Sequence, residues 1–218
     1  MNINHAVHET LTGDMLAAIF NRQKELMAKY HHIEARSGLL QTEDCPVNLD
    51  DRRGQARIKD FSWRVMEELG EALDAKSHAD HYQEELIDGL HFLTELTILA
   101  GRDYNTIIPE DLPKFHSDHL EDLYETARTQ IDGPVYTDIN HWVAQFVEQL
   151  AMMCNCLKNK PWKQSMMKTD QEAFYGRLTN VWVCYMAILA MAGMKPTDIA
   201  DTYLRKSQVN QFRQRSNY

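Results

Sequence analysis

The chain of 218 residues contains little glycine and proline, 9 and 6 residues, and no apolar run that approaches the roughly 20 residues of a membrane span. Its opening, MNINHAVHET, has neither the basic nor the apolar segment of a secretory signal. A net charge of −9 disfavours broad binding of nucleic acid through its phosphates. These absences predict one cytoplasmic domain, residues 1–218, that uses neither a membrane nor nucleic acid as a partner.

Cysteine is also scarce, with four residues and no CxxC pair. Cys154 and Cys156 could bind a soft metal, but helical neighbours two apart point in different directions. Reduced thiols in apolar surroundings are the favoured interpretation. An acidic protein that acts on a small anionic substrate would then need a metal ion to bring the two together.

Apolar residues recur at helical spacing almost everywhere, and β-branched runs are short, so the chain is predicted to be all-α, a helical bundle. Residues 37–53 form a predicted loop, and the polar segment 103–137, with Pro109 and Pro113, is a predicted small cap or mobile segment. The predicted helices lie near 13–36, 54–76, 80–101, 117–130, 138–157, 169–193 and 196–215.

An internal repeat relates two predicted helical hairpins. Residues 85–107 lie over residues 177–199 at an offset of 92, and residues 67–75 lie over 148–156 at an offset of 81, so the second hairpin has a loop 11 residues longer. The alternative is two amphipathic pairs that share only their periodicity. If the repeat is real, the first copy keeps its acids where the second has amide, apolar and cationic residues, Gln149, Met152, Arg177 and Asn180.

Two pairs of acids in the first hairpin have the same spacing: Glu68 with Glu71, and Glu85 with Asp88. Residues three apart stand on one helix face, so antiparallel neighbours could aim four carboxylates at one point. Like charges at short range raise one another's pKa unless a cation separates them. All-oxygen ligation favours Mg²⁺, with Mn²⁺ as the alternative. The competing interpretation is an ordinary solvated helix face.

The stretches EELGE and EELIDGLHF resemble the EExxE and ExxD pattern of the all-α nucleoside triphosphate pyrophosphatases, which include dimeric dUTPases, phage dCTP/dUTP pyrophosphatases and MazG-type enzymes. The C-terminal YLRKSQVNQFRQRSNY is similar to the closing stretch of the dimeric dUTPase and phage branch. Ser207 and Asn217 depart from that branch's Asn and Gly. The matching residues are Lys206, Asn210, Arg213, Gln214 and Tyr218.

The resemblance implies that Mg²⁺ ions bind Glu68, Glu71, Glu85 and Asp88 together with the triphosphate, and that water cleaves the bond between the α and β phosphates. We expect Glu68 to accept the proton of that water, with Glu67 as a weaker alternative. Lys206, Asn210 and Arg213, on one stripe of the C-terminal helix, would hold the triphosphate. Asn180 resembles the residue of the family that contacts the sugar, and Tyr203 would stack there too.

The family also indicates which residues contact the base. His91 and Phe92 follow the ExxD pair, where the branch stacks a ring on uracil. Gln23 matches a base-reading glutamine, but Leu26 stands where the branch has an asparagine, which puts strict dUTP specificity in doubt. Trp63 corresponds to an aromatic residue that lines the pocket.

The leading hypothesis is therefore a Mg²⁺-dependent pyrophosphatase that converts dUTP, and dCTP as a second substrate, to the monophosphate and pyrophosphate. Two alternatives are a MazG-like enzyme for other or modified nucleotides and a non-catalytic helical binding protein. The long apolar stretches FLTELTILA and VWVCYMAILAMAG, together with the family resemblance, predict a homodimer, although a repeat within one chain could make a monomer sufficient.

Overall fold

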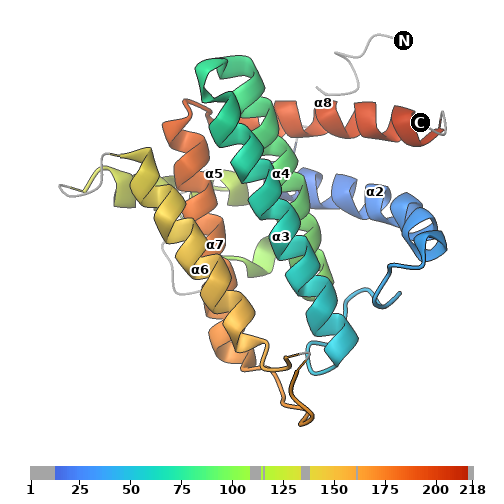
Figure 1. Ribbon diagram of the computed structural model, residues 1–218. Coiled ribbons are helices and arrows are strands. Elements are labelled where there is room, and N and C mark those ends of the chain that lie inside the picture. The colour runs from blue at the N-terminus through green and yellow to red at the C-terminus, as the bar shows by residue number, and fades with distance from the viewer. Residues whose placement is uncertain (1–12, 109–113, 115, 134–137, 161, 216–218) are drawn as a thin grey trace.

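The computed structural model describes residues 13–108, 114, 116–133, 138–160 and 162–215, except for the side chains of 213–215. This part of the chain contains α-helices, two short 3₁₀ turns and no strand, which confirms the predicted all-α fold (Figure 1). Each predicted helix is present with both ends within two residues of its expected position. The helices are α2 (Met15–Ser37), α3 (Arg52–Asp74), α4 (Ala79–Leu99), α5 (His119–Ile131), α6 (Ile139–Cys156), α7 (Gln171–Met191) and α8 (Pro196–Arg215).

Aspartate begins five of these helices. In each case a side-chain oxygen accepts a backbone N–H of the first turn, which satisfies a donor that has no partner within the helix. The five residues are Asp14, Asp51, Asp118, Asp138 and Asp170. Because these caps are local, the starts of the helices follow directly from the sequence.

The helices α3 and α4 form one hairpin, and α6 and α7 form another (Figure 1). Both hairpins end in the same way, at Gly101 and Gly193, whose φ angles are 80° and 82°. The residue after each glycine donates its N–H to the carbonyl five residues earlier, at 3.0 and 3.1 Å. This matching left-handed cap supports the internal repeat, since the two glycines stand 92 residues apart.

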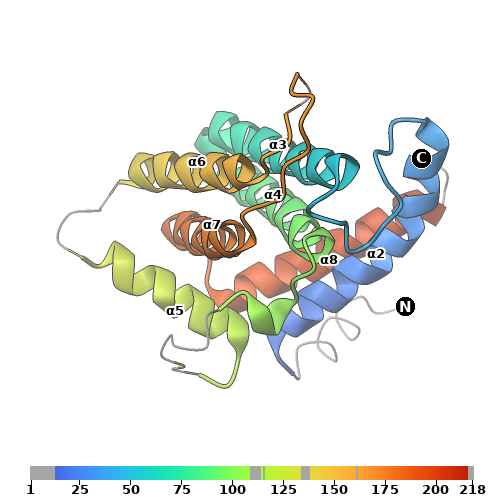
Figure 2. The ribbon, with the colours of Figure 1, turned by 90° about the horizontal axis from the view of Figure 1, so that it is seen from below.

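The remaining helices α5, α2 and α8 lie on the side of the hairpins formed by α7 and α4, opposite α3 and α6 (Figure 2). α5 packs against α7, and α2 packs against both α4 and α8. The segment 103–137, predicted as a cap or mobile segment, contains the 3₁₀ turn Tyr104–Thr106 and helix α5, whose apolar side packs on the second hairpin. The arrangement places the N-terminal half of α4 between α3 on one side and α8 on the other.

The apolar stretches that motivated the predicted dimer are buried within the single chain. All described side chains of 93–100 and 181–190 are less than 9% exposed. The argument from uncovered apolar faces is therefore wrong, and the homodimer remains a prediction from the family resemblance alone. Within the described residues no single helix is long and apolar enough to span a membrane, although α7 with Pro196–Phe212 would pass by length and composition as a pair bent by 99°.

The long loop between α6 and α7 is fastened to the start of α3. The amide nitrogen of Gln55, buried in α3, donates to Leu49 O at 2.8 Å and to Thr169 Oγ1 at 3.0 Å, and its oxygen accepts Asn159 N–H at 2.9 Å. Arg52 donates to two further loop carbonyls, at 2.8 and 3.1 Å. The extra residues of the second hairpin thus serve to join it to the first.

Candidate active site

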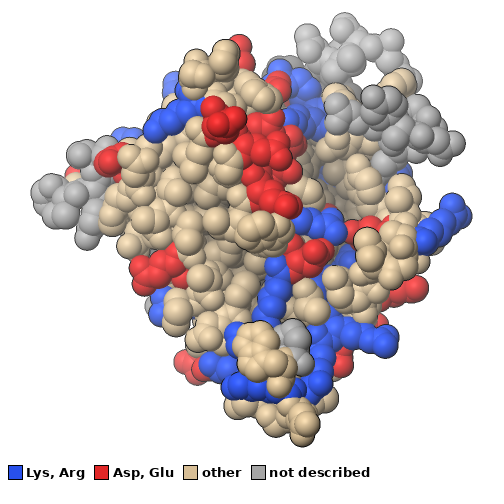
Figure 3. Space-filling view, in the orientation of Figure 1, with Lys and Arg blue, Asp and Glu red and all other residues tan. Residues whose placement is uncertain are grey.

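Three of the four predicted carboxylates meet where α3 packs on α4. Glu68, Glu85 and Asp88 are half-buried, and each offers an oxygen that lies within 4.8 Å of the others. Glu71, one turn further along α3, is exposed and lies outside this close group. In Figure 3 red atoms gather over the upper part of α3 and α4, so the cluster lies within a wider acidic surface.

Close packing at Gly89 brings the hairpin helices and α7 together beside the cluster. A Cβ at this position would lie 2.2 Å from the hydroxyl of Tyr185 and 3.4 Å from Cβ of Glu68. The Tyr185 hydroxyl is buried and donates to Leu86 O at 2.7 Å. The glycine therefore allows a tyrosine of α7 to brace the helix that carries Glu85 and Asp88.

The close packing of the three acids affects the protonation of Glu68. Burial, and after it the charge of Asp88, raises the pKa of Glu68 to about 7. Glu71 and Glu85 act in the same direction and Lys206 acts against it. Lys206 Nζ lies 2.5 Å from Asp88 Oδ2, so α8 brings a positive charge to the acids. The role predicted for Lys206, contact with the triphosphate, remains a prediction.

A cavity of about 310 Å³ opens from the carboxylates and runs between α2, α3, α4 and α8. Glu68 and Asp88 lie at one end of it. Its other lining residues include four that the sequence had assigned to substrate, Gln23, His91, Phe92 and Asn210, and five more: Leu26, Tyr30, Glu34, Arg64 and Glu95. The structure thus places four of the nine residues predicted to bind substrate around one space next to the predicted metal ligands.

The inner wall of this cavity is a buried hydrogen-bonded group on three helices. Tyr203 donates its hydroxyl to Gln23 Oε1 at 2.7 Å, and its ring stacks on His91 with centroids 3.7 Å apart. His91 Nδ1 lies 3.0 Å from the same Gln23 oxygen. Burial, and after it the charge of Lys206, lowers the pKa of His91 to about 3, so the ring is neutral at pH 7. His91 and Phe92 both line the cavity, and Tyr203 covers one face of the His91 ring. Stacking of either ring on a base remains a prediction.

Sequence reasoning missed Glu95, which is buried at the inner end of the cavity. Gln23 Nε2 donates to Glu95 Oε2 at 2.8 Å, and the carboxyl is 7% exposed. Burial, and after it the charge of Glu34, raises the pKa of Glu95 to about 7. One signal could have found it: Glu95 is the one acid in the mostly apolar LHFLTEL, seven residues after Asp88 and so on the same helix face.

Three predicted site residues lie elsewhere or cannot be placed. Trp63 is 63% exposed and donates its indole N–H to Glu67 Oε1 at 2.7 Å, outside the cavity. Asn180 lines a different cavity, bounded by α5, α6 and α7, and donates to Gln149 Oε1 at 3.2 Å. Arg213 lies in α8, with its side chain outside the described residues; Tyr218 lies outside them altogether. The roles predicted for these residues remain predictions.

A family model described as dUTPase matches residues 72–218, which is more than half of the chain. The chain belongs to this dUTPase family. Membership makes it a nucleoside triphosphate pyrophosphatase of the dUTP type, a hydrolase with a nucleotide substrate. The dUTPase match includes Glu85, Asp88 and the C-terminal helix but begins just after Glu68 and Glu71. No curated protein and no solved structure matches the chain.

Proposed function

We propose that this protein is a Mg²⁺-dependent pyrophosphatase of deoxyuridine and deoxycytidine triphosphates, in a single domain of residues 1–218. The observation that carries the proposal is the placement of three carboxylate oxygens within 4.8 Å at the mouth of a cavity lined by amide, aromatic and carboxyl groups. The products would be the deoxynucleoside monophosphate and pyrophosphate. Cytoplasmic location and a homodimer belong to the same proposal through the family resemblance.

The donor set fits a hard divalent ion. Glu68, Glu85 and Asp88 supply only oxygen atoms. Burial, and after it the negative charges of Asp88, Glu71 and Glu85, raises the pKa of Glu68, and a bound cation would offset both effects. Mg²⁺ matches this chemistry, and Mn²⁺ is the alternative. When bound, the ion would neutralise phosphate oxygens and acidify a coordinated water. Glu71 is close enough to influence Glu68 and would complete the ligand set of the family.

Glu68 is the residue we assign as general base. Within the described residues, Glu85 lies 3.1 Å from His81 and Asp88 pairs with Lys206, whereas Glu68 has no ion pair. Among the three carboxylates of the close group, Glu68 is thus the one available to accept a proton from water. Attack of that water breaks the bridge between the α and β phosphates, and pyrophosphate leaves with the electron pair of the broken bond.

The C-terminal helix would hold the phosphates. Lys206 already reaches the carboxylate cluster, and Asn210, one turn further along α8, lines the same cavity. Arg213 continues this stripe in the sequence, two turns after Lys206. A chain of donors on α8 opposite the acids of α3 and α4 suits a polyphosphate bridged by a metal ion.

The test is an incubation of the protein with each dNTP and NTP in Mg²⁺, with pyrophosphate and orthophosphate measured separately. We expect pyrophosphate from dUTP and dCTP, and a fall in kcat of at least ~10²-fold in Glu68→Gln. Glu67→Gln is the matched control, because Glu67 is exposed and turned toward Trp63. Orthophosphate as the first product, or equal activities of the two variants, would contradict the proposal.

A further inference from the structure

Glu95 is a buried acid for which the fold provides little compensation. A buried carboxyl is costly unless it is paired or well hydrogen-bonded. Among the described residues Glu95 has one hydrogen bond, from Gln23 Nε2 at 2.8 Å, and no ion pair. The nearby cations are engaged elsewhere: Arg57 and Arg64 both bind Glu34, at 2.9 and 3.3 Å. Stability of the fold does not explain why an acid stands here.

The orientation of Glu95 follows from its neighbours on three helices. Gln23 Oε1 accepts the Tyr203 hydroxyl and faces His91 Nδ1, so the Gln23 amide nitrogen must point the other way, toward Glu95 Oε2. The second carboxyl oxygen, Oε1, has no hydrogen bond from the described part of the chain. Glu95 lines the cavity that Glu68 and Asp88 also line, and it lines a second cavity of about 340 Å³ together with Arg57 and Cys45.

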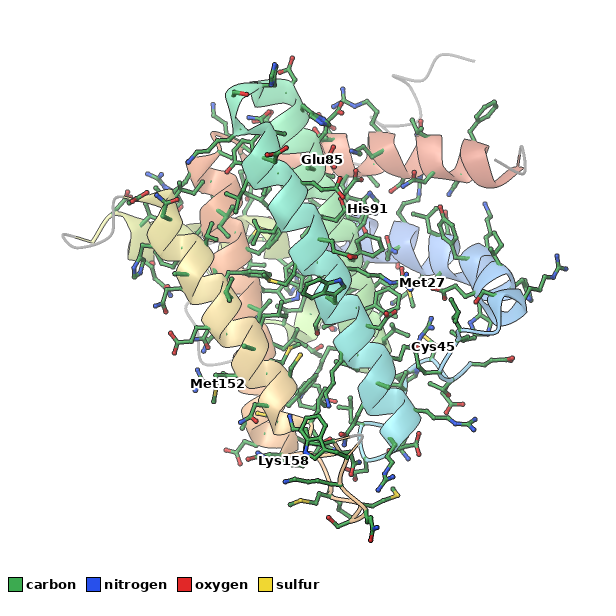
Figure 4. The ribbon with its side chains drawn as sticks, viewed as in Figure 1. Met27, Cys45, Glu85, His91, Met152 and Lys158 are labelled. Atoms are coloured by element: carbon green, nitrogen blue, oxygen red, sulfur yellow. The ribbon has the colours of Figure 1, made fainter. Side chains whose placement is uncertain are left out.

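The position of Glu95 along α4 matches the length of a nucleoside. Seven residues separate it from Asp88, which is about 10 Å at the rise of an α-helix, and both line the same cavity. Figure 4 labels Glu85 and His91, which follow one another down the side of the hairpin that faces α2. A nucleotide whose phosphates lie at the acids would therefore extend its base toward the inner end, where Glu95 lies.

We propose that Glu95 is a specificity-determining residue that contacts the N3–C4 edge of a pyrimidine base, a role that rests on the proposed function. Its ionised form accepts a hydrogen bond from either the 4-amino group of cytosine or N3–H of uracil. Its protonated form pairs with either base through one donated and one accepted bond. Glu95 would thus supply the polar contact to the base that the related branch obtains from an asparagine at the position of Leu26. It would allow both pyrimidines to bind.

The test compares dCTP with the triphosphate of the 2-pyrimidinone deoxynucleoside, which lacks the 4-amino group. For the wild type we expect kcat/KM to fall by at least ~10-fold on this change of base, mainly through KM, because a site built around a polar contact rejects an analogue that lacks it. In Glu95→Leu the two substrates should differ by less than about 3-fold. Glu95→Met, also unbranched and close in volume, provides a second variant if the leucine variant is unstable.

Glu148→Gln is the matched control, because Glu148 is exposed on α6 and does not line the cavity. It should keep the wild-type discrimination between the two bases. A wild type that hydrolyses both substrates equally well, or a Glu95→Leu variant that retains the full discrimination, would overturn the role of Glu95 and leave the proposed function intact. A wild type that releases no pyrophosphate from any dNTP would overturn the proposed function, and this inference with it.

Discussion

Lys206 Nζ lies 2.5 Å from Asp88 Oδ2 and donates to the backbone carbonyl of Glu84 at 3.1 Å. The helix α8 is thereby tied to the part of α4 that carries Glu85 and Asp88. The same ammonium group is near the cavity that would hold the triphosphate. Lys206 is thus placed to exchange one anionic partner for another when a metal ion and substrate bind.

Replacement of Lys206 by methionine should show whether Lys206 interacts with both the substrate and the carboxylate cluster. We expect KM for dUTP to rise roughly 10-fold, since a charge-assisted hydrogen bond contributes about 1.5–3 kcal/mol. The rise in Tm produced by Mg²⁺ should become larger, because the acids lose their protein cation. Arg205→Met, on the exposed side of α8, is the control. An unchanged KM in Lys206→Met would remove Lys206 from the substrate site.

Divalent ions should stabilise the fold and be required for turnover. An ion at 100 times its Kd adds about 2.7 kcal/mol to the free energy of unfolding. Because Glu85 belongs to the close cluster and Glu71 does not, Glu85→Gln should lose more of the Mg²⁺-dependent rise in Tm than Glu71→Gln. Melting curves with Mg²⁺ and with EDTA measure this order. Full activity after exhaustive chelation would contradict a metal site.

The buried Glu95 should make stability fall as pH rises. Its pKa is about 7 in the folded protein and 4.5 ordinarily, so between these values the folded state holds more protons than the unfolded state. The contribution of Glu95 to the free energy of unfolding is fully present below about pH 4.5. It falls by at most about 3 kcal/mol as the pH rises to 7 and above. In EDTA, the Tm of Glu95→Gln should therefore gain on that of the wild type from pH 5 to pH 8. Parallel curves of Tm against pH for the two proteins would contradict this prediction. Glu68 is present in both proteins, so its effect on Tm does not alter the difference between them.

Two glycines on the same hairpin should respond to alanine in opposite ways. Gly89→Ala places a methyl group 2.2 Å from the Tyr185 hydroxyl and should destabilise the fold by about 1–3 kcal/mol. Gly70→Ala, on exposed α3 with no atom within 4 Å of its Cβ, should stabilise it by about 0.5–1 kcal/mol. Urea unfolding measures both. Equal effects would show that Gly89 is not needed for the approach of α7.

The oligomeric state is tested directly by light scattering. The family resemblance predicts a homodimer, of about twice the 25.4 kDa of one chain. The burial of the apolar faces of α4 and α7 within one chain removes the physical reason first given for this assembly. A mass of one chain at micromolar concentration would decide for the monomer.

The sequence predicted the helices well because their signals are local. Apolar periodicity marks each helix, aspartate marks most of the starts, and glycines mark the ends of α4 and α7. The acid pairs were found for the same reason, since residues three apart on a helix share a face whatever else the chain does. These features do not depend on long-range packing.

The inner wall of the cavity could not be predicted in this way. Gln23 meets His91 and Tyr203 across 68 and 180 residues of sequence, so their hydrogen bonds exist only once α2, α4 and α8 have packed. The position of Glu95 depends on the same packing. Conversely, Trp63 was assigned to the pocket by resemblance, but its place on α3 leaves it exposed.

The hydrogen bonds that Gln55 makes to the loop between α6 and α7 affect how the two hairpins unfold. Chains built from two copies of a hairpin can open one copy at a time, and hydrogen exchange then reports two independent levels of protection. Here the buried Gln55 of the first hairpin is hydrogen-bonded to both Thr169 and Asn159 of the second. Local unfolding of either hairpin therefore breaks the hydrogen bonds that join the two. Amides at the centres of α3 and α7 should therefore exchange in a single cooperative event, and Gln55→Leu should separate them into two.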